Sequence, residues 1–166
     1  MCKLLNVFFV MAFLLSGGNA FSADRVYEKP SAFITSAFGK IPQAKVIQLS
    51  STQQKAVRAI LGKRYKTTSI RHWTVGSKTA FILEEIGKAE YITTGIVVSS
   101  GKISSVKVLI YRESHEWEVA RTSFTKQFRG ATLKKNPKVK NIAGATLSVR
   151  SLTKLARLSL YLDSIK

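Results

Sequence analysis

Two runs of sequence decide the fold: Tyr91-Ile92-Thr93-Thr94-Gly95-Ile96-Val97-Val98 and Ile103-Ser104-Ser105-Val106-Lys107-Val108-Leu109-Ile110-Tyr111. Both are rich in β-branched and aromatic residues, which are favoured in strands. Between them stands Ser99-Ser100-Gly101-Lys102. Glycine adopts the positive φ that a tight turn between antiparallel strands needs. The pair therefore predicts an antiparallel hairpin.

The preceding residues extend this hairpin into a sheet. Two more strand-like runs, 70–75 and 79–83, end near Gly76 and Gly87, so we expect a meander of four antiparallel strands between residues 69 and 112. Residues 44–49 alternate like a further strand. Residues 31–38, with Ser31 as the cap, and 52–61, which end at Gly62, are predicted to be helices. The fold class is α+β.

A last helix is expected to follow Asn141-Ile142-Ala143-Gly144-Ala145-Thr146-Leu147-Ser148 and to reach about Leu162. Gly144 and Ala145 are small enough for the backbone to approach a ligand closely, and Thr146 and Ser148 add two hydroxyls. The first turn of a helix has N–H groups without intrahelical partners and partial positive charge, so such a stretch suits a phosphate. Ser and Thr are also ordinary helix caps, so a purely structural role stays open.

The stretch 144–148 resembles the G-A-T-[hydrophobic]-[Ser/Thr] core of the flavinylation motif in the FMN-binding domain family, known from the C subunit of sodium-translocating NADH:quinone reductase and the G subunit of the Rnf complex. In that family the matching Thr is joined to FMN by a phosphoester, which a flavin transferase installs. The resemblance implies covalent attachment at Thr146, with Gly144, Ala145, Leu147 and Ser148 around the phosphate.

Two positions depart from the family pattern. Ala143 stands where Ser or Thr is usual, and Lys140 stands where an Asp is usual. Covalent and noncovalent binding of FMN therefore both stay open at this point.

The resemblance extends over about residues 80–162, because the order strand, turn, strand, Glu113-Ser114, then Gln127-Phe128-Arg129-Gly130 also recurs in the family. Family members contact the flavin with the loop after the second strand. We therefore expect Glu113 and Ser114 beside the ring or the ribityl chain, and Trp117 is a candidate ring contact. Phe124 and Phe128, four residues apart, are predicted to pack a helix on the sheet.

Residues 1–23 have the parts of a secretory signal peptide and its cleavage region. Lys3 precedes an apolar run over 4–15, and Gly18 and Ala20 supply small residues at a cleavage point near Ala20. The run is shorter than the roughly 20 apolar residues that a membrane-spanning helix needs. We expect an exported or periplasmic protein whose residues 24–166 form a single FMN-binding domain, and association with a membrane stays open.

The composition excludes several kinds of catalytic and metal site. The net charge is +18, and the one cysteine, Cys2, falls within the predicted signal peptide, so disulfides and thiol catalysis are excluded for the exported chain. His72 and His115 are the only histidines, too few for a structural zinc site, and no metal is expected. Glu84 and Glu85 are neighbours in a strand and point to opposite faces, so they are not an acid/base pair.

The sequence predicts an exported electron-transfer protein that binds FMN. We expect it to act as an electron carrier or as a component of a redox complex, in preference to a stand-alone enzyme. Its expected partners are a flavin transferase, a redox protein or membrane redox complex, and an anionic membrane surface. Export argues against nucleic acid as the reason for the charge. The alternative is an exported basic module that binds anionic lipid or polyanion without a cofactor.

Overall fold

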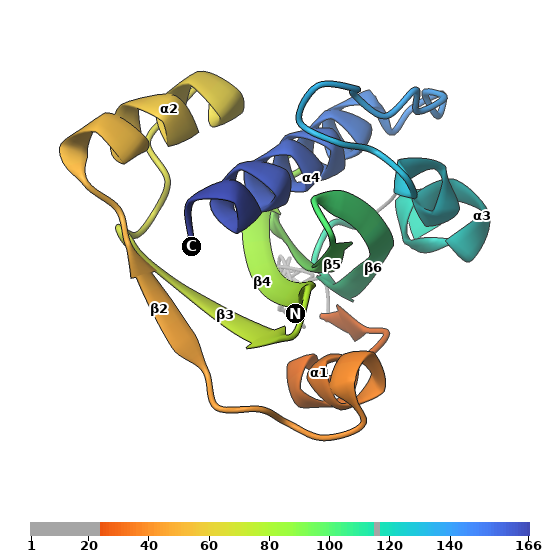
Figure 1. Cartoon of the computed structure of the whole chain (residues 1–166). Helices are drawn as coiled ribbons and strands as arrows, with labels where there is room; N and C mark the ends of the chain where they lie inside the picture. Colours follow the sequence, from red (N-terminus) through yellow and green to blue (C-terminus); the bar gives the residue numbers. More distant parts are fainter. Residues whose placement is uncertain (1–23, 115–116) are drawn as a thin grey trace, which may run out of the picture.

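Six antiparallel strands form one open sheet in the order β1-β6-β5-β4-β3-β2, with helices on both faces (Figure 1). A computed structural model describes residues 24–114 and 117–166; the predicted signal peptide and His115 lie outside them. The strands are β1 (Arg25–Val26), β2 (Lys45–Gln48), β3 (Ser69–Val75), β4 (Lys78–Ile86), β5 (Tyr91–Ser99) and β6 (Lys102–Tyr111). The α+β class is confirmed.

The predicted meander is β3 to β6, and each of its neighbouring strands pairs antiparallel. The hairpin between β5 and β6 closes at the pair Ser99–Lys102, with Ser100 at φ 49° and Gly101 at φ 71°. Two successive positive φ values give the turn a twist that matches the twist of the strands. β2 extends the sheet beside β3 as predicted. The edge strand β1 was not predicted.

The helices are α1 (Pro30–Phe38), α2 (Ser51–Leu61), α3 (Thr122–Thr125) and α4 (Thr146–Ile165), with 3₁₀ turns η1 (Trp117–Ala120) and η2 (Lys126–Phe128). α2 has a capping box between Ser50 and Gln53 and ends at Gly62, φ 79°. The predicted cap of α1 was wrong. Lys29 is the N-cap and Pro30 takes the first helical position, where its missing N–H costs nothing.

α4 lies across one face of the sheet, with α2 beside it (Figure 1). The side chains predicted to form its packing face are all buried: Val149, Leu152, Leu155, Ala156, Ser159 and Leu162. They join the main core, which includes Phe81 and Ile96 from the middle of the sheet. A helix of 20 residues is about 30 Å long. α4 therefore spans the sheet, and this packing fixes the position of its first turn.

α1 covers part of the opposite face. Its Phe33 and Ile34 form a smaller cluster with Ala80, Val97 and Leu109. Phe33 lies directly on Gly95, where an added Cβ would come within 2.7 Å of the Phe33 ring. The close approach of α1 to β5 therefore requires glycine at this position.

Within residues 24–114 and 117–166, no helix combines the length and the apolar character that crossing a membrane would need.

Candidate functional site

The bend before α4 is open to solvent. Gly144 has φ 83°, and a Cβ added there would meet nothing within 4 Å, so the backbone conformation and not crowding calls for glycine. Ala145 is the N-cap and is buried; its N–H donates to the Ile142 carbonyl at 3.0 Å. Because alanine has no side-chain acceptor, the N–H groups of the first turn are left for water or a ligand.

Thr146 is the first residue of α4 and is half-buried. The side-chain amide of Asn141 donates a hydrogen bond to Thr146 Oγ1 at 2.9 Å. A hydroxyl that accepts one bond keeps its own hydrogen and a second lone pair for another partner. Leu147 beside it is 45% exposed. The helix start is thus accessible, and its cap is Ala145, so the purely structural role as a hydroxyl cap is not what the structure shows.

Ser148 differs from Thr146 in its surroundings. Its side chain is fully buried, and its Oγ has no hydrogen-bond partner within the described part of the chain. This oxygen lies 3.1 Å from the position that a Cβ on Gly87 would take. The Ser148 hydroxyl therefore faces the turn between β4 and β5, away from the open bend. A role of Ser148 at a phosphate stays a prediction and would use its backbone N–H.

Glu113 is buried and binds backbone. Its Oε1 accepts three N–H groups of the β4–β5 turn: Lys88 at 2.5 Å, Ala89 at 2.9 Å and Glu90 at 3.0 Å. A Cβ on Gly87 would come within 2.7 Å of the same oxygen. The carboxylate thus holds the turn, and the absence of a side chain at residue 87 makes room for it.

Glu113 and the start of α4 meet at this turn. Ser151 Oγ donates to the Ile86 carbonyl at 2.5 Å, and Ser148 lies against Gly87. We call this arrangement the helix junction: residues 86–90, Glu113 and residues 146–151. Two segments predicted separately as cofactor contacts are therefore adjacent in space. Ser114 follows Glu113 directly and is exposed.

Trp117 lies in η1 and is 40% exposed. The guanidinium carbon of Arg121 is 4.2 Å from the centre of its ring, so a cation covers one ring face. Phe124 and Phe128 are buried and pack edge to face with their centres 5.7 Å apart. Their predicted packing role is confirmed.

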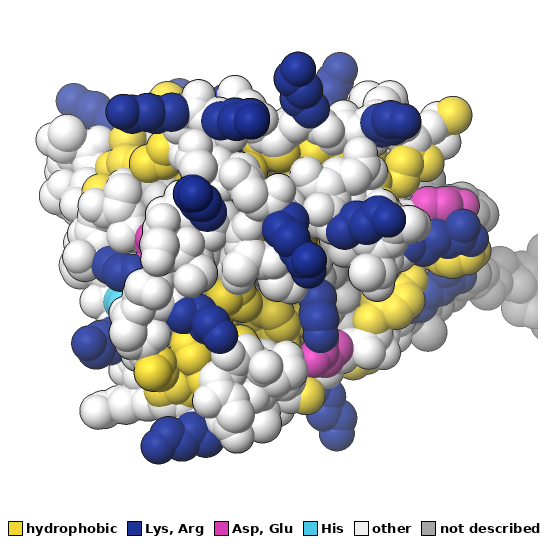
Figure 2. Space-filling view, turned by 45° about the vertical axis from the view of Figure 1, so that its right-hand side comes forward, with side chains coloured by type: hydrophobic (Ala, Val, Ile, Leu, Met, Phe, Trp, Pro, Cys, Tyr) yellow, Lys and Arg dark blue, Asp and Glu magenta, His cyan; other side chains and the backbone are white. Residues whose placement is uncertain are grey.

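Positive charge is concentrated in the segment that leads to α4 and in α4 itself. Residues 119–162 contain ten Lys and Arg and no Asp or Glu. The ion pairs made by the described residues all fall outside this span. Figure 2 turns the α3 side of the molecule toward the viewer and shows Lys and Arg over the whole face, with few acids. The excess of positive charge over this stretch favours an anionic group near the helix start.

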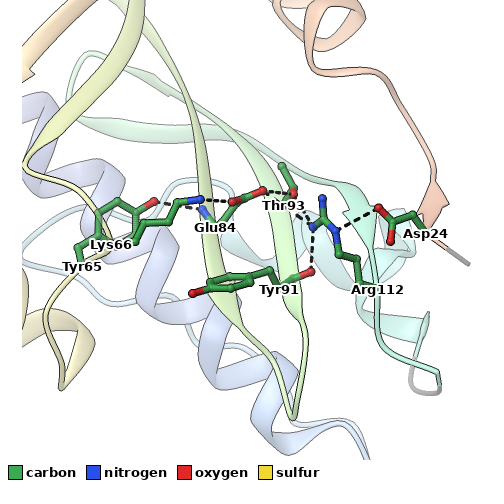
Figure 3. A network of polar contacts seen from close by, with 7 residues as sticks. All are labelled: Asp24, Tyr65, Lys66, Glu84, Tyr91, Thr93 and Arg112. Carbon is green, nitrogen blue, oxygen red and sulfur yellow. Dashed lines mark hydrogen bonds and ion pairs between the residues drawn. The ribbon is translucent and has the colours of Figure 1, made fainter. Parts of the chain in front are cut away.

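A polar network anchors the end of β6 next to the helix junction (Figure 3). Arg112 pairs with Asp24 at 3.2 Å and donates to Thr93 Oγ1 at 3.0 Å. Thr93 in turn donates to Glu84 at 2.6 Å, and Lys66 pairs with the same carboxylate. Arg112 is the residue directly before Glu113, so the network fixes the backbone from which that carboxylate projects.

The pKa values of Glu84 and Tyr65, both in this region, are shifted. Burial raises the pKa of Glu84, but hydrogen bonds from Lys66 and Thr93 and the charges of Lys66 and Arg112 outweigh it, so the pKa lies below the ordinary value. Burial raises the pKa of Tyr65 to about 12. Its hydroxyl accepts the Glu84 N–H at 3.2 Å. Both shifts belong to the network and not to the bend at Gly144.

A comparison with known protein families finds one match. Residues 87–160 match the family model of the FMN-binding domain. The matched span contains Glu113, Trp117 and the whole bend before α4. No curated protein sequence matches the chain.

Proposed function

We propose that the chain, whose residues 87–160 match the FMN-binding domain family, is an exported electron-transfer protein that carries FMN at the start of α4. The family assigns FMN as the cofactor. The position of the flavin, its covalent attachment, export and electron transfer are the proposal.

The observation that carries the proposal is the accessible Thr146 hydroxyl. It lies beside an open glycine bend, at a helix start without a side-chain cap, and Asn141 holds its oxygen. These features suit a phosphate: free backbone N–H groups, partial positive charge of the helix, and space for the group. Attachment joins Thr146 Oγ1 to the phosphorus of FMN, so the chain gains the mass of FMN less one water.

The other site residues have supporting roles. Gly144 and Ala145 present backbone to the phosphate, and Leu147 offers an exposed apolar side chain beside it. Glu113 positions the helix start through the turn that it holds. Ser114 and Trp117 are exposed and available to the ribityl chain and the ring.

Bound FMN supplies the one- and two-electron chemistry, while the protein binds it, orients it and sets its electrostatic surroundings. The acid-free stretch 119–162 lowers the free energy of a reduced, negatively charged flavin. The same surface suits an acidic redox protein or a redox complex in an anionic membrane. A flavin transferase would act on the hydroxyl of the half-buried Thr146.

An exported basic module without a cofactor is the other candidate. It accounts for the net charge of +18 but leaves the bend at Gly144 and the Asn141–Thr146 hydrogen bond without a role.

The test is coexpression of the chain with a flavin transferase, followed by intact mass and visible absorbance. We expect an FMN adduct in the wild type and in Thr146→Ser, and none in Thr146→Ala. Thr122→Ala, which changes an exposed threonine in α3, is the matched control and should be modified like the wild type. A wild type that is yellow but carries no added mass would support FMN binding and contradict the phosphoester. A colourless, unmodified wild type would overturn the proposal.

A further inference from the structure

A pocket lies on the face of the sheet opposite α4. Its volume is about 390 Å³, within the range of small-molecule sites. Its walls are mainly apolar and come from Ile34 in α1, Ile41 after α1, Trp73 in β3 and Ile82 in β4. Figure 1 shows α1 and the segment that leads from it to β2 on this side of the sheet. The pocket is therefore separated from the proposed flavin position by the sheet itself.

Alternation along β3 assigns the side chains to the two faces. Ile70 and His72 are buried on the α4 side, whereas Arg71 and Trp73 point to the α1 side. α1 packs on β4 and β5 but leaves β2 and β3 partly uncovered. Ile41 is 56% exposed and Val46, the cross-strand partner of Arg71, is 61% exposed. Apolar surface thus surrounds a single arginine.

The polar groups of the pocket can all donate hydrogen bonds. The Arg71 side chain makes no hydrogen bond or ion pair with any residue in 24–114 or 117–166, and its neighbours in the pocket include no acid. Ser31 also lines the pocket, and its hydroxyl is not used as a cap because Lys29 is the N-cap of α1. The first turn of α1 has no acidic residue, so the helix end adds positive potential.

We propose that this pocket binds a small carboxylate with an aliphatic body. A planar guanidinium matches a carboxylate with two parallel hydrogen bonds, whereas one cation cannot compensate a doubly charged phosphate. The isoleucines and Trp73 bury the aliphatic chain, as the walls of ligand pockets do. This site is independent of FMN, since it uses residues outside 87–160 and the other face of the sheet.

The chain contains two tryptophans, which give the test an internal control. Titration of the full chain with octanoate is followed by NMR on the two indole N–H signals, assigned with Trp73→Phe. We expect a saturable shift of the Trp73 signal while the Trp117 signal stays in place. Octanol, the uncharged match, should need at least a tenfold higher concentration.

Matched variants separate the charge from general effects. Arg71→Gln should lower the affinity for octanoate at least tenfold and leave the affinity for octanol unchanged. Arg71→Lys should have an affinity for octanoate between those of Arg71→Gln and the wild type. Lys45→Gln removes a cation from the paired strand β2; Lys45 lies opposite His72 on the other face, and this variant should bind octanoate like the wild type. Arg71 is exposed, so its variants should fold, which the remaining NMR signals report.

Three results would overturn the proposal. The first is a linear shift of both indole signals, which indicates unspecific binding. The second is equal affinity for octanoate and octanol, or unchanged affinity in Arg71→Gln. The third is binding to vesicles of anionic lipid without any response to octanoate, which would identify a membrane surface in place of a ligand pocket.

Discussion

Replacing Glu113 with alanine tests whether the helix junction depends on one buried carboxylate. Glu113 Oε1 accepts three backbone N–H groups at 2.5 to 3.0 Å, and hydrogen bonds to a charged group contribute about 1.5–3 kcal/mol each. The turn is exposed, so water replaces part of what is lost. We therefore expect Glu113→Ala to lower the free energy of unfolding by about 3 kcal/mol, well below the sum of three separate bonds.

Glu113→Gln refines this estimate. It keeps an acceptor oxygen but loses the charge, so the expected loss is about half as large. Urea unfolding followed by circular dichroism measures the free energy of unfolding of Glu113→Ala and Glu113→Gln. Glu90→Ala is the matched control: it removes a carboxylate from the same turn, but that side chain is exposed, and a change within about 0.5 kcal/mol is expected.

Glu113→Ala should also loosen the start of α4. Amide hydrogen exchange at residues 148–151 should become faster in Glu113→Ala than in Glu90→Ala, because the turn that packs against the helix is no longer held. If Glu113→Ala unfolds at the urea concentration of the wild type and exchanges at the same rate, the reasoning about the junction is refuted.

Three further predictions concern packing and pH. Gly95→Ala places a Cβ within 2.7 Å of the Phe33 ring and should lower the free energy of unfolding, measured by thermal unfolding, by about 2 kcal/mol. The double variant with Phe33→Leu should recover part of this stability. If the second substitution leaves the loss unchanged, the clash with Phe33 is contradicted. Burial, then the charges of Lys166 and Lys45, lower the pKa of His72, so the folded state binds this proton less well than the unfolded state. The wild type should lose more stability than His72→Gln when the pH falls below the ordinary value of 6.5, as urea midpoints on either side of that pH will show. Burial raises the pKa of Tyr65 to about 12, so stability present below pH 10 should decline between pH 10 and 12. The late step of an absorbance titration should disappear in Tyr65→Phe, and a titration curve that this substitution leaves unchanged would contradict the prediction.

The central fold could be predicted because its signals are local. Strands β3 to β6 pack against the main core, and β4 to β6 also pack against the cluster under α1, so they are rich in β-branched and aromatic residues. Gly101 marks the turn because of its positive φ. The packing face of α4 follows from the helical period. β1 was missed because a strand of two residues has no period to recognise.

The site was predicted less completely, since its contacts are not local. Glu113 binds N–H groups 23 to 25 residues earlier in the chain, and nothing in the local pattern distinguishes a backbone anchor from a ligand contact. Whether the Ser148 hydroxyl points to solvent or to Gly87 depends on how α4 sits on the turn. The expected cap at Ser31 failed because Pro30 suits the first helical position and moves the cap to Lys29.

Tandem mass spectrometry of the trypsin-digested, coexpressed protein can locate the flavin on the chain. Cleavage after Lys140 and Arg150 releases residues 141–150, which contain one threonine, Thr146, and one serine, Ser148. We expect FMN on this peptide, with fragment ions that assign it to Thr146. Flavin on Ser148 or on any other peptide, or a peptide without flavin from protein that the transferase has modified, would contradict it.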